Sequence, residues 1–143
     1  MLQPAAKAQT MSGWEWPDTP ITYVVDGDTF DAMVARDLGF NGKAIFPVRL
    51  RLHRVNTPPK NSVTGRIATA RVAELTAAPV FVLTLKPYKY GGPAHTVGEW
   101  MAEVVLPSGD NLSDLLVREE LAVYWDGTGP RPELRRLVER SDG

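Results

Sequence analysis

The sequence predicts an α+β domain, and three observations lead to this class. Alternating or β-branched residues occur at 21–25, 29–36 and 44–55, with tight turns between them. A helical pattern follows, and further strand-like segments come after the helix. The 143 residues, 43% of them hydrophobic, are enough for one hydrophobic core.

Composition excludes several classes of protein. The chain has no cysteine, so disulfides and thiolate metal sites are excluded. It has no apolar run long enough to predict a transmembrane helix, and the first twenty residues lack the apolar core of a signal peptide. We therefore expect a cytoplasmic protein with no membrane partner.

The first strands follow directly from residue type. Ile21–Val25 is rich in β-branched residues, and Asp26–Asp28 has the composition of a tight turn. Thr29–Arg36 resumes as a strand in which apolar side chains alternate. Asn41-Gly42 predicts a second turn, from which a long strand, Ala44–Val55, returns.

The later elements alternate between helix and strand. Thr64 is the predicted N-cap of a helix from about Gly65 to Ala77. A short helix over Asn111–Glu119 is capped by either Asn111 or Ser113. Further strands are predicted at Val80–Lys86, Trp100–Leu106 and Leu121–Trp125, and a final helix from Pro132 to about Arg140. We interpret residues 1–19 as an N-terminal arm and residues 20–143 as one domain. This order fits a Greek-key barrel of the OB type, with an open α+β sandwich as the alternative.

Positive charge is concentrated in one segment although the net charge is only −1. Between Asp37 and Glu74 there is no acidic residue. The basic residues there are Lys43, Arg49, Arg51, Arg54, Lys60, Arg66 and Arg71. The segment is either a solvated basic face or a patch for an anionic partner. For nucleic acid, the candidate contacts are Arg49, Arg51, Arg54 and Lys60, together with Lys86, Tyr88, Lys89 and Tyr90, where the tyrosines are candidate base-stacking platforms.

Two motifs carry a resemblance to a known family. VDGDT at Val25–Thr29, followed by RLHRVNTP at Arg51–Pro58, resembles the thermonuclease (staphylococcal nuclease-like) family. The resemblance extends through NLSDLLVREELAV at Asn111–Val123 and covers roughly Ile21 to Tyr124. It implies a five-stranded OB-type Greek-key β-barrel with two to three helices. The DLGF insertion after the second strand is similar to compact members encoded by actinobacterial phages, which would locate the protein in the host cytoplasm or the virion.

The family resemblance implies Ca²⁺-dependent phosphodiester hydrolysis. By this resemblance Asp28 stands at the first metal-ligand position, Asp26 lies nearby, and Thr57 supplies a backbone carbonyl. The second ligand position is Asn56 instead of aspartate; an amide oxygen carries no charge, so we expect weaker Ca²⁺ binding. Arg51 matches the family's first catalytic arginine.

At two other family positions this sequence has residues that cannot perform the family's catalytic role. Pro59 occupies the general-base position and cannot accept a proton, and Glu99 occupies the position of the second arginine. Loss of a transition-state donor costs on the order of 3 kcal/mol, and loss of a general base costs about a hundred- to ten-thousandfold in rate. We therefore expect a pseudoenzyme that binds nucleic acid or a protein partner in a larger assembly.

Other interpretations stay open at this level. A rebuilt nuclease would use Glu99 or Glu103 as the base, with Lys60 or Arg54 as the cation. A nucleotide-binding protein without hydrolysis is a third reading. The structural alternatives are that Asp26 and Asp28 only build a turn, and that Arg51 pairs with Asp28 or Glu99. Arg54 falls at an inward apolar position of the family, which a local bulge or a snorkelling side chain would explain.

Overall fold

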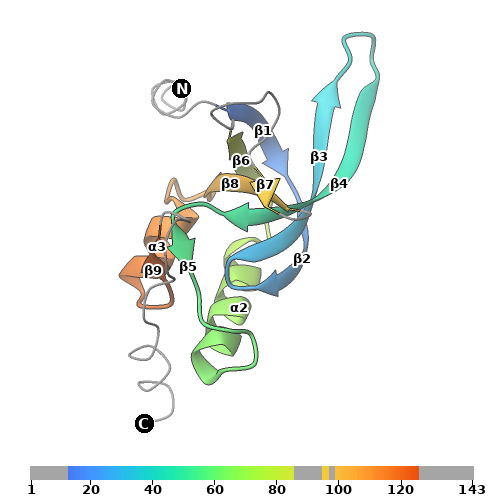
Figure 1. Ribbon diagram of the computed structural model, residues 1–143. Coiled ribbons are helices and arrows are strands. Elements are labelled where there is room, and N and C mark those ends of the chain that lie inside the picture. Colours follow the sequence, from blue (N-terminus) through green and yellow to red (C-terminus); the bar gives the residue numbers. More distant parts are fainter. Residues whose placement is uncertain (1–12, 86–94, 97–98, 126–143) are drawn as a thin grey trace.

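The computed structural model describes residues 13–85, 95–96 and 99–125, which form one large sheet, one small sheet and two helices (Figure 1). The strands are β1 (Gly13–Thr19), β2 (Ile21–Asp26), β3 (Thr29–Asp37), β4 (Lys43–Leu52), β5 (Val55–Asn56), β6 (Val80–Leu85), β7 (His95–Thr96), β8 (Glu99–Val105) and β9 (Val123–Tyr124). The helices are α2 (Val63–Leu75) and α3 (Leu112–Arg118). The predicted α+β class is confirmed.

The large sheet is mixed. Its order is β1-β6-β8-β4-β3-β2, with β7 paired to β8, and β5 pairs with β9 separately. Strands β4 and β8 run parallel, whereas the other ladders are antiparallel. Within the described residues no ladder joins the edge strands β1 and β2, so the sheet is not closed. These two strands are nevertheless consecutive in the chain, with only Pro20 between them.

Strand β1 corrects the predicted extent of the N-terminal arm. Gly13–Thr19 pairs with β6 instead of belonging to an arm, and residues 1–12 lie outside the described residues. Trp16 is buried, and its ring packs edge-on against Phe46 at 5.9 Å and beside Trp100 at 6.4 Å. Its indole nitrogen donates a hydrogen bond to Thr84 Oγ1 at 2.8 Å. This burial of an aromatic side chain with a satisfied N–H explains why the segment joins the sheet.

The β3–β4 hairpin continues beyond the body of the sheet (Figure 1). Its ladder is regular from Thr29↔Arg51 to Asp37↔Lys43. Asn41 adopts φ 63°, which asparagine tolerates better than most residues, so the predicted Asn-Gly turn is confirmed.

The core lies between the sheet and the two helices. Phe30, Leu50 and Leu52 of the sheet are fully buried, as are Val72 of α2 and Leu116 of α3. Within the described residues no helix is long and apolar enough to cross a membrane.

Both described helices begin at a side-chain cap. Helix α2 starts earlier than predicted, because Ser62 and not Thr64 accepts a hydrogen bond from the backbone N–H of Gly65. Thr64 is instead fully buried. Of the two predicted caps of α3, Asn111 and Ser113, the structure shows Asn111, whose side chain accepts a hydrogen bond from the backbone N–H of Asp114. The predicted helix after Pro132 lies outside the described residues.

Candidate phosphate site and the Glu103 network

The predicted turn at Asp26–Asp28 connects β2 to β3 and rests on α2. The Asp28 backbone N–H donates to Asp26 Oδ1 at 3.1 Å, which is the predicted turn chemistry. A Cβ on Gly27 would lie 2.9 Å from Ala68 Cβ and 3.0 Å from Thr57 Cγ2. Glycine is therefore required here because the turn backbone is in direct contact with α2 and with the segment after β5.

Asp28 is the centre of the site and is only 5% exposed. Its Oδ1 accepts from Thr29 Oγ1 at 3.0 Å, and its Oδ2 accepts from the Thr57 backbone N–H at 3.0 Å. Arg51 Nη1 lies 2.8 Å from the same Oδ2, and both side chains are largely buried. The structure thus brings Asp28, Arg51 and Thr57 together, as the resemblance implied.

The two carboxylates of the turn titrate differently. Burial, followed by the hydrogen bond and negative charge of Asp28, raises the pKa of Asp26 to about 6. Burial also opposes ionisation of Asp28, but the contacts with Asp26, Arg51 and Thr57 lower its pKa below the usual value. Asp28 is therefore the ionised partner of Arg51, and Asp26 takes up a proton first as the pH falls.

These residues fit a Ca²⁺ ion poorly as they are arranged. Calcium requires six to eight oxygen ligands, preferably charged ones. Both oxygens of Asp28 already accept hydrogen bonds, and the nearest cation to Oδ2 is the Arg51 guanidinium. The neighbouring ligand candidate, Asn56, is buried and uncharged. No group of three histidine, aspartate or glutamate side chains in the described part of the chain is arranged to hold a metal.

Arg51 and Glu99 do not form the expected alternative pair. Arg51 bonds Asp28 and reaches the Val55 carbonyl at 3.3 Å. Glu99 precedes Trp100, whose ladder partner is Leu50, so Glu99 lies beside Arg49 on the neighbouring strand. The pKa of Arg49 is raised mainly by its hydrogen bond to Asp31, with a smaller contribution from Glu99.

Pro59, which the resemblance aligns with a general base, helps to build the start of α2. It is exposed, and its carbonyl accepts hydrogen bonds from Ser62 N at 3.0 Å and Ser62 Oγ at 2.7 Å. A Cβ on Gly65 would lie 1.7 Å from this carbonyl oxygen. Pro59 therefore belongs to the tight turn that starts α2.

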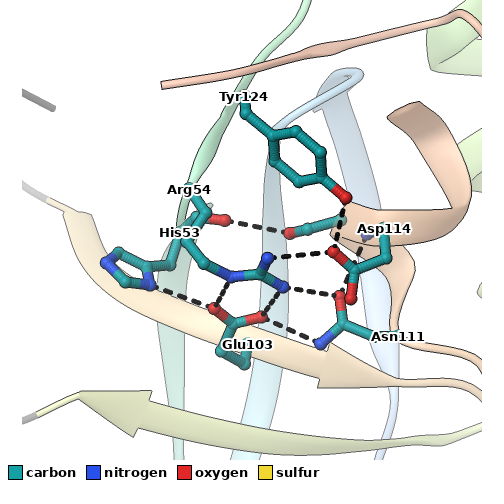
Figure 2. Close-up of polar contacts among 7 residues, drawn as sticks. His53, Arg54, Glu103, Asn111, Asp114 and Tyr124 are labelled. Carbon is teal, nitrogen blue, oxygen red and sulfur yellow. Dashed lines mark hydrogen bonds and ion pairs between the residues drawn. The ribbon is translucent and has the colours of Figure 1, made fainter. Parts of the chain in front are cut away.

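A second polar cluster, the Glu103 network, lies where β4 gives way to β5 (Figure 2). Glu103 of β8 is 1% exposed, and its two oxygens accept four hydrogen bonds. One oxygen accepts from His53 Nδ1 at 3.0 Å and Arg54 Nε at 2.8 Å. The other accepts from Arg54 Nη2 at 3.1 Å and Asn111 Nδ2 at 2.9 Å. Burial opposes ionisation, but these donors lower the pKa of Glu103 to about 2.

Arg54 explains why the predicted long strand is interrupted. Its φ is 75°, in the left-handed region, and the chain bends between Leu52 and Val55, a local irregularity of the kind that one of the two alternatives for Arg54 invoked. The bend turns the guanidinium towards Glu103 and towards Asp114 Oδ1 at 2.9 Å. The backbone of the bend is also held, because Trp125 N donates to the Arg54 carbonyl at 2.7 Å.

The network takes up Glu103 and Arg54, one of the two candidate bases and one of the two candidate cations of the rebuilt-site interpretation. Glu103 and Arg54 are bonded to each other, so neither is free as base or cation in the described arrangement. Sequence reasoning proposed no role for His53, Asn111 or Asp114 in such a cluster. The available signal was weak: Asn111 and Asp114 occupy the N-cap and third positions of α3, and only the fold turns them towards Arg54.

Most arginines of the basic segment are neutralised by acidic partners. The ion pairs are Arg49–Asp31, Arg51–Asp28, Arg54–Glu103, Arg54–Asp114, Arg71–Glu74 and Arg71–Glu119. Within the described residues Lys43, Lys60 and Arg66 form no salt bridge. The basic segment is therefore less positive than its composition indicates. Four predicted nucleic-acid contacts, Lys86, Tyr88, Lys89 and Tyr90, lie outside the described residues.

A scan of the chain against protein-family models gives no match, and a search of the curated proteins finds no similar sequence.

Proposed function

We propose that this chain is a thermonuclease-like domain that does not hydrolyse phosphodiesters by the family's mechanism and serves as a binding module. Its partner would be nucleic acid or a protein in a larger assembly, such as a phage particle. The observation that carries the proposal is the buried ion pair at 2.8 Å between Arg51 and Asp28.

The ion pair opposes both halves of the family's chemistry. A guanidinium held by a buried carboxylate must lose that partner before it can grip a phosphate, and leaving a buried charge unpaired costs about 3–5 kcal/mol. The same carboxylate would have to exchange Arg51 for a metal. Pro59 supplies no base, and Glu99 adds negative charge where the family has an arginine.

We further propose that the sheet is a variant of the family's OB-type Greek-key barrel. Two features support this topology. The edge strands β1 and β2 are separated by Pro20 alone, so one bent segment contacts both ends of the sheet order. In addition, β4 and β8 pair in parallel, as a crossover connection through α2 and β6 requires.

The distribution of charge favours a protein partner over nucleic acid. Nucleic-acid binding draws on unpaired lysines and arginines that replace counterions on phosphates. Arg49, Arg51 and Arg54 were three of the candidate contacts, and each is bonded to a carboxylate. An oligonucleotide would have to compete with all three.

A nuclease assay tests the loss of hydrolysis. The protein is incubated with single-stranded DNA and, separately, RNA, each with Ca²⁺, Mg²⁺ or Mn²⁺. We expect no cleavage above a buffer control. Cleavage that disappears in Asp28→Ala or Arg51→Ala would refute the proposal and identify a rebuilt nuclease.

A gain-of-function variant makes the negative result informative. The triple substitution Asn56→Asp, Pro59→Glu and Glu99→Arg restores the family's side chains, and Ca²⁺-dependent cleavage should appear if only these changes disabled the site. The matched control adds Arg51→Met, which should abolish that cleavage. The salt dependence of DNA binding is a separate test of the partner. If the wild-type chain binds single-stranded DNA with an affinity that falls steeply between 50 and 200 mM salt, contacts with phosphates drive binding and the partner is nucleic acid. If the affinity for DNA does not depend on salt, such contacts do not drive binding, and a protein partner is favoured.

A further inference from the structure

A groove of about 470 Å³ lies along β2 and α2, and Asp28, Arg51 and Thr57 are not among its lining residues. Figure 1 shows the strand and the helix side by side. The groove is lined by Ile21, Thr22, Tyr23, Val24, Lys60, Arg66, Thr69, Ala70, Ala73, Thr76 and Ala77. Its helix side consists largely of short side chains, namely Thr69, Ala70, Ala73, Thr76 and Ala77.

The groove runs along the free edge of the sheet. Strand β2 ends the sheet order, and within the described residues it pairs with β3 alone. Four consecutive residues, Ile21 to Val24, line the groove. Because neighbouring side chains of a strand point to opposite faces, contact with all four indicates that the groove follows the strand edge. An edge strand presents unpaired N–H and C=O groups to whatever occupies such a groove.

The rim of the groove is positive. Lys60 and Arg66 line it, and no described lining residue is acidic. Neither side chain has a salt bridge within the described residues, although Lys60 lies 5.7 Å from the centroid of the Tyr23 ring. They are thus two of the few cations between Asp37 and Glu74 that remain available to a partner.

We propose that this groove binds an extended, acidic peptide segment of a protein partner as an additional strand on β2. Main-chain hydrogen bonds to the β2 edge would supply affinity, and the positive rim would select acidic side chains. Single-stranded nucleic acid is the competing occupant, because Tyr23 is 56% exposed beside Lys60. The peptide is favoured because a free strand edge offers hydrogen bonds in strand register, which a sugar-phosphate chain cannot match.

This inference deepens the proposed binding function, and it does not depend on the loss of hydrolysis. The test is the selection of ligands from a phage-displayed library of random twelve-residue peptides against the full-length immobilised protein. We expect enrichment of peptides that combine β-branched residues with aspartate or glutamate. A selected peptide is then synthesised with a fluorophore, and its affinity is measured by fluorescence polarisation.

Three measurements distinguish the groove from other surfaces. Ala73→Trp fills the groove from an exposed helix position and should weaken binding at least tenfold, whereas Ile67→Trp, exposed on α2 outside the groove, should not. Lys60→Glu combined with Arg66→Glu should also weaken binding at least tenfold. N-methylation of alternate peptide nitrogens should abolish it, because strand addition needs these donors. Circular dichroism establishes that each variant is folded.

The proposal is overturned by any of three results. These are a library that yields no peptide above an uncoated surface, peptides that bind Ala73→Trp as well as wild type, and peptides that tolerate N-methylation at every position. Displacement of the peptide by a decathymidine probe, combined with tighter binding of that probe, would reassign the groove to nucleic acid. The nuclease assay is unaffected by these results, so the two proposals fail separately.

Discussion

Glu103→Gln should be one of the most destabilising single substitutions in the described part of the chain. Each oxygen of Glu103 accepts two donors, supplied by His53, Arg54 and Asn111. A glutamine would turn its NH₂ group towards one of these donor pairs, which would then lose its acceptor at this buried position. It would also leave Arg54 with Asp114 as its only carboxylate.

The expected loss is on the order of 3 kcal/mol. Breaking a buried ion pair by removing one partner costs about 3–5 kcal/mol. The pKa of Glu103 leads to a similar figure: a fall from 4.5 to about 2 corresponds to roughly 3 kcal/mol of stabilisation at neutral pH. The side chain is 1% exposed, so solvent screening reduces this little.

The pH dependence follows from the direction of that shift. A carboxyl group whose folded pKa is depressed contributes its stability above the unfolded value, here 4.5. The contribution is lost as the pH falls through the folded value of about 2. The stability difference between wild type and Glu103→Gln should therefore be constant from pH 7 to 6 and should shrink by roughly half at pH 3.

Urea unfolding followed by tryptophan fluorescence measures both effects, because Trp16 is buried in the core. The matched control is Glu119→Gln, which removes the partly exposed partner of Arg71 and should cost a small fraction of the Glu103 loss. A Glu103→Gln protein as stable as wild type at pH 7, or a difference that does not change between pH 7 and pH 3, would refute the reasoning.

Two further substitutions test the environment of the phosphate site. Asn56→Asp should raise the affinity for Ca²⁺ by about tenfold or more, because it adds a charged oxygen ligand beside Thr57. Isothermal titration calorimetry measures this affinity. An unchanged affinity would contradict the prediction and would mean that Asp28 stays bonded to Arg51. Gly65→Ala should destabilise by about 2 kcal/mol or more in the same urea assay, because the new Cβ would meet the Pro59 carbonyl. Ala70→Gly, exposed on the same helix, should cost only about 1 kcal/mol, and equal losses for the two variants would contradict the predicted clash.

The local elements were predictable because each has a strong signal in its own residues. Alternation predicted β3 and β4, and the Asn41-Gly42 turn between them follows from residue type. The cap of α3, Asn111, was one of the two candidates that residue type suggested. In contrast, β1 was missed because Gly13–Thr19 has little strand periodicity and is held by burial of Trp16, a contact with residues far along the chain.

The sequence indicated which residues lie in the candidate site, but not which of them form ion pairs. Asp28, Arg51 and Thr57 lie together as the resemblance implied. Whether Arg51 pairs with Asp28 or Glu99 depends on the register of β4 against β8, which no local pattern specifies. The Glu103 network was out of reach for the same reason, because its members come from β8, α3 and the bend at Arg54.

The bend at Arg54 affects both the candidate phosphate site and the basic segment. A regular strand would place successive side chains on opposite faces, so Arg51 and Arg54 would point to different sides of the sheet. The left-handed residue adds a change of direction at which Arg54 reaches Glu103, and Thr57, just after β5, donates its backbone N–H to Asp28. Arg51 before the bend and Arg54 within it are therefore both held in ion pairs. In the fold most arginines of this basic segment are ion-paired, and two of its cations without a salt bridge in the described residues, Lys60 and Arg66, line the groove beside β2.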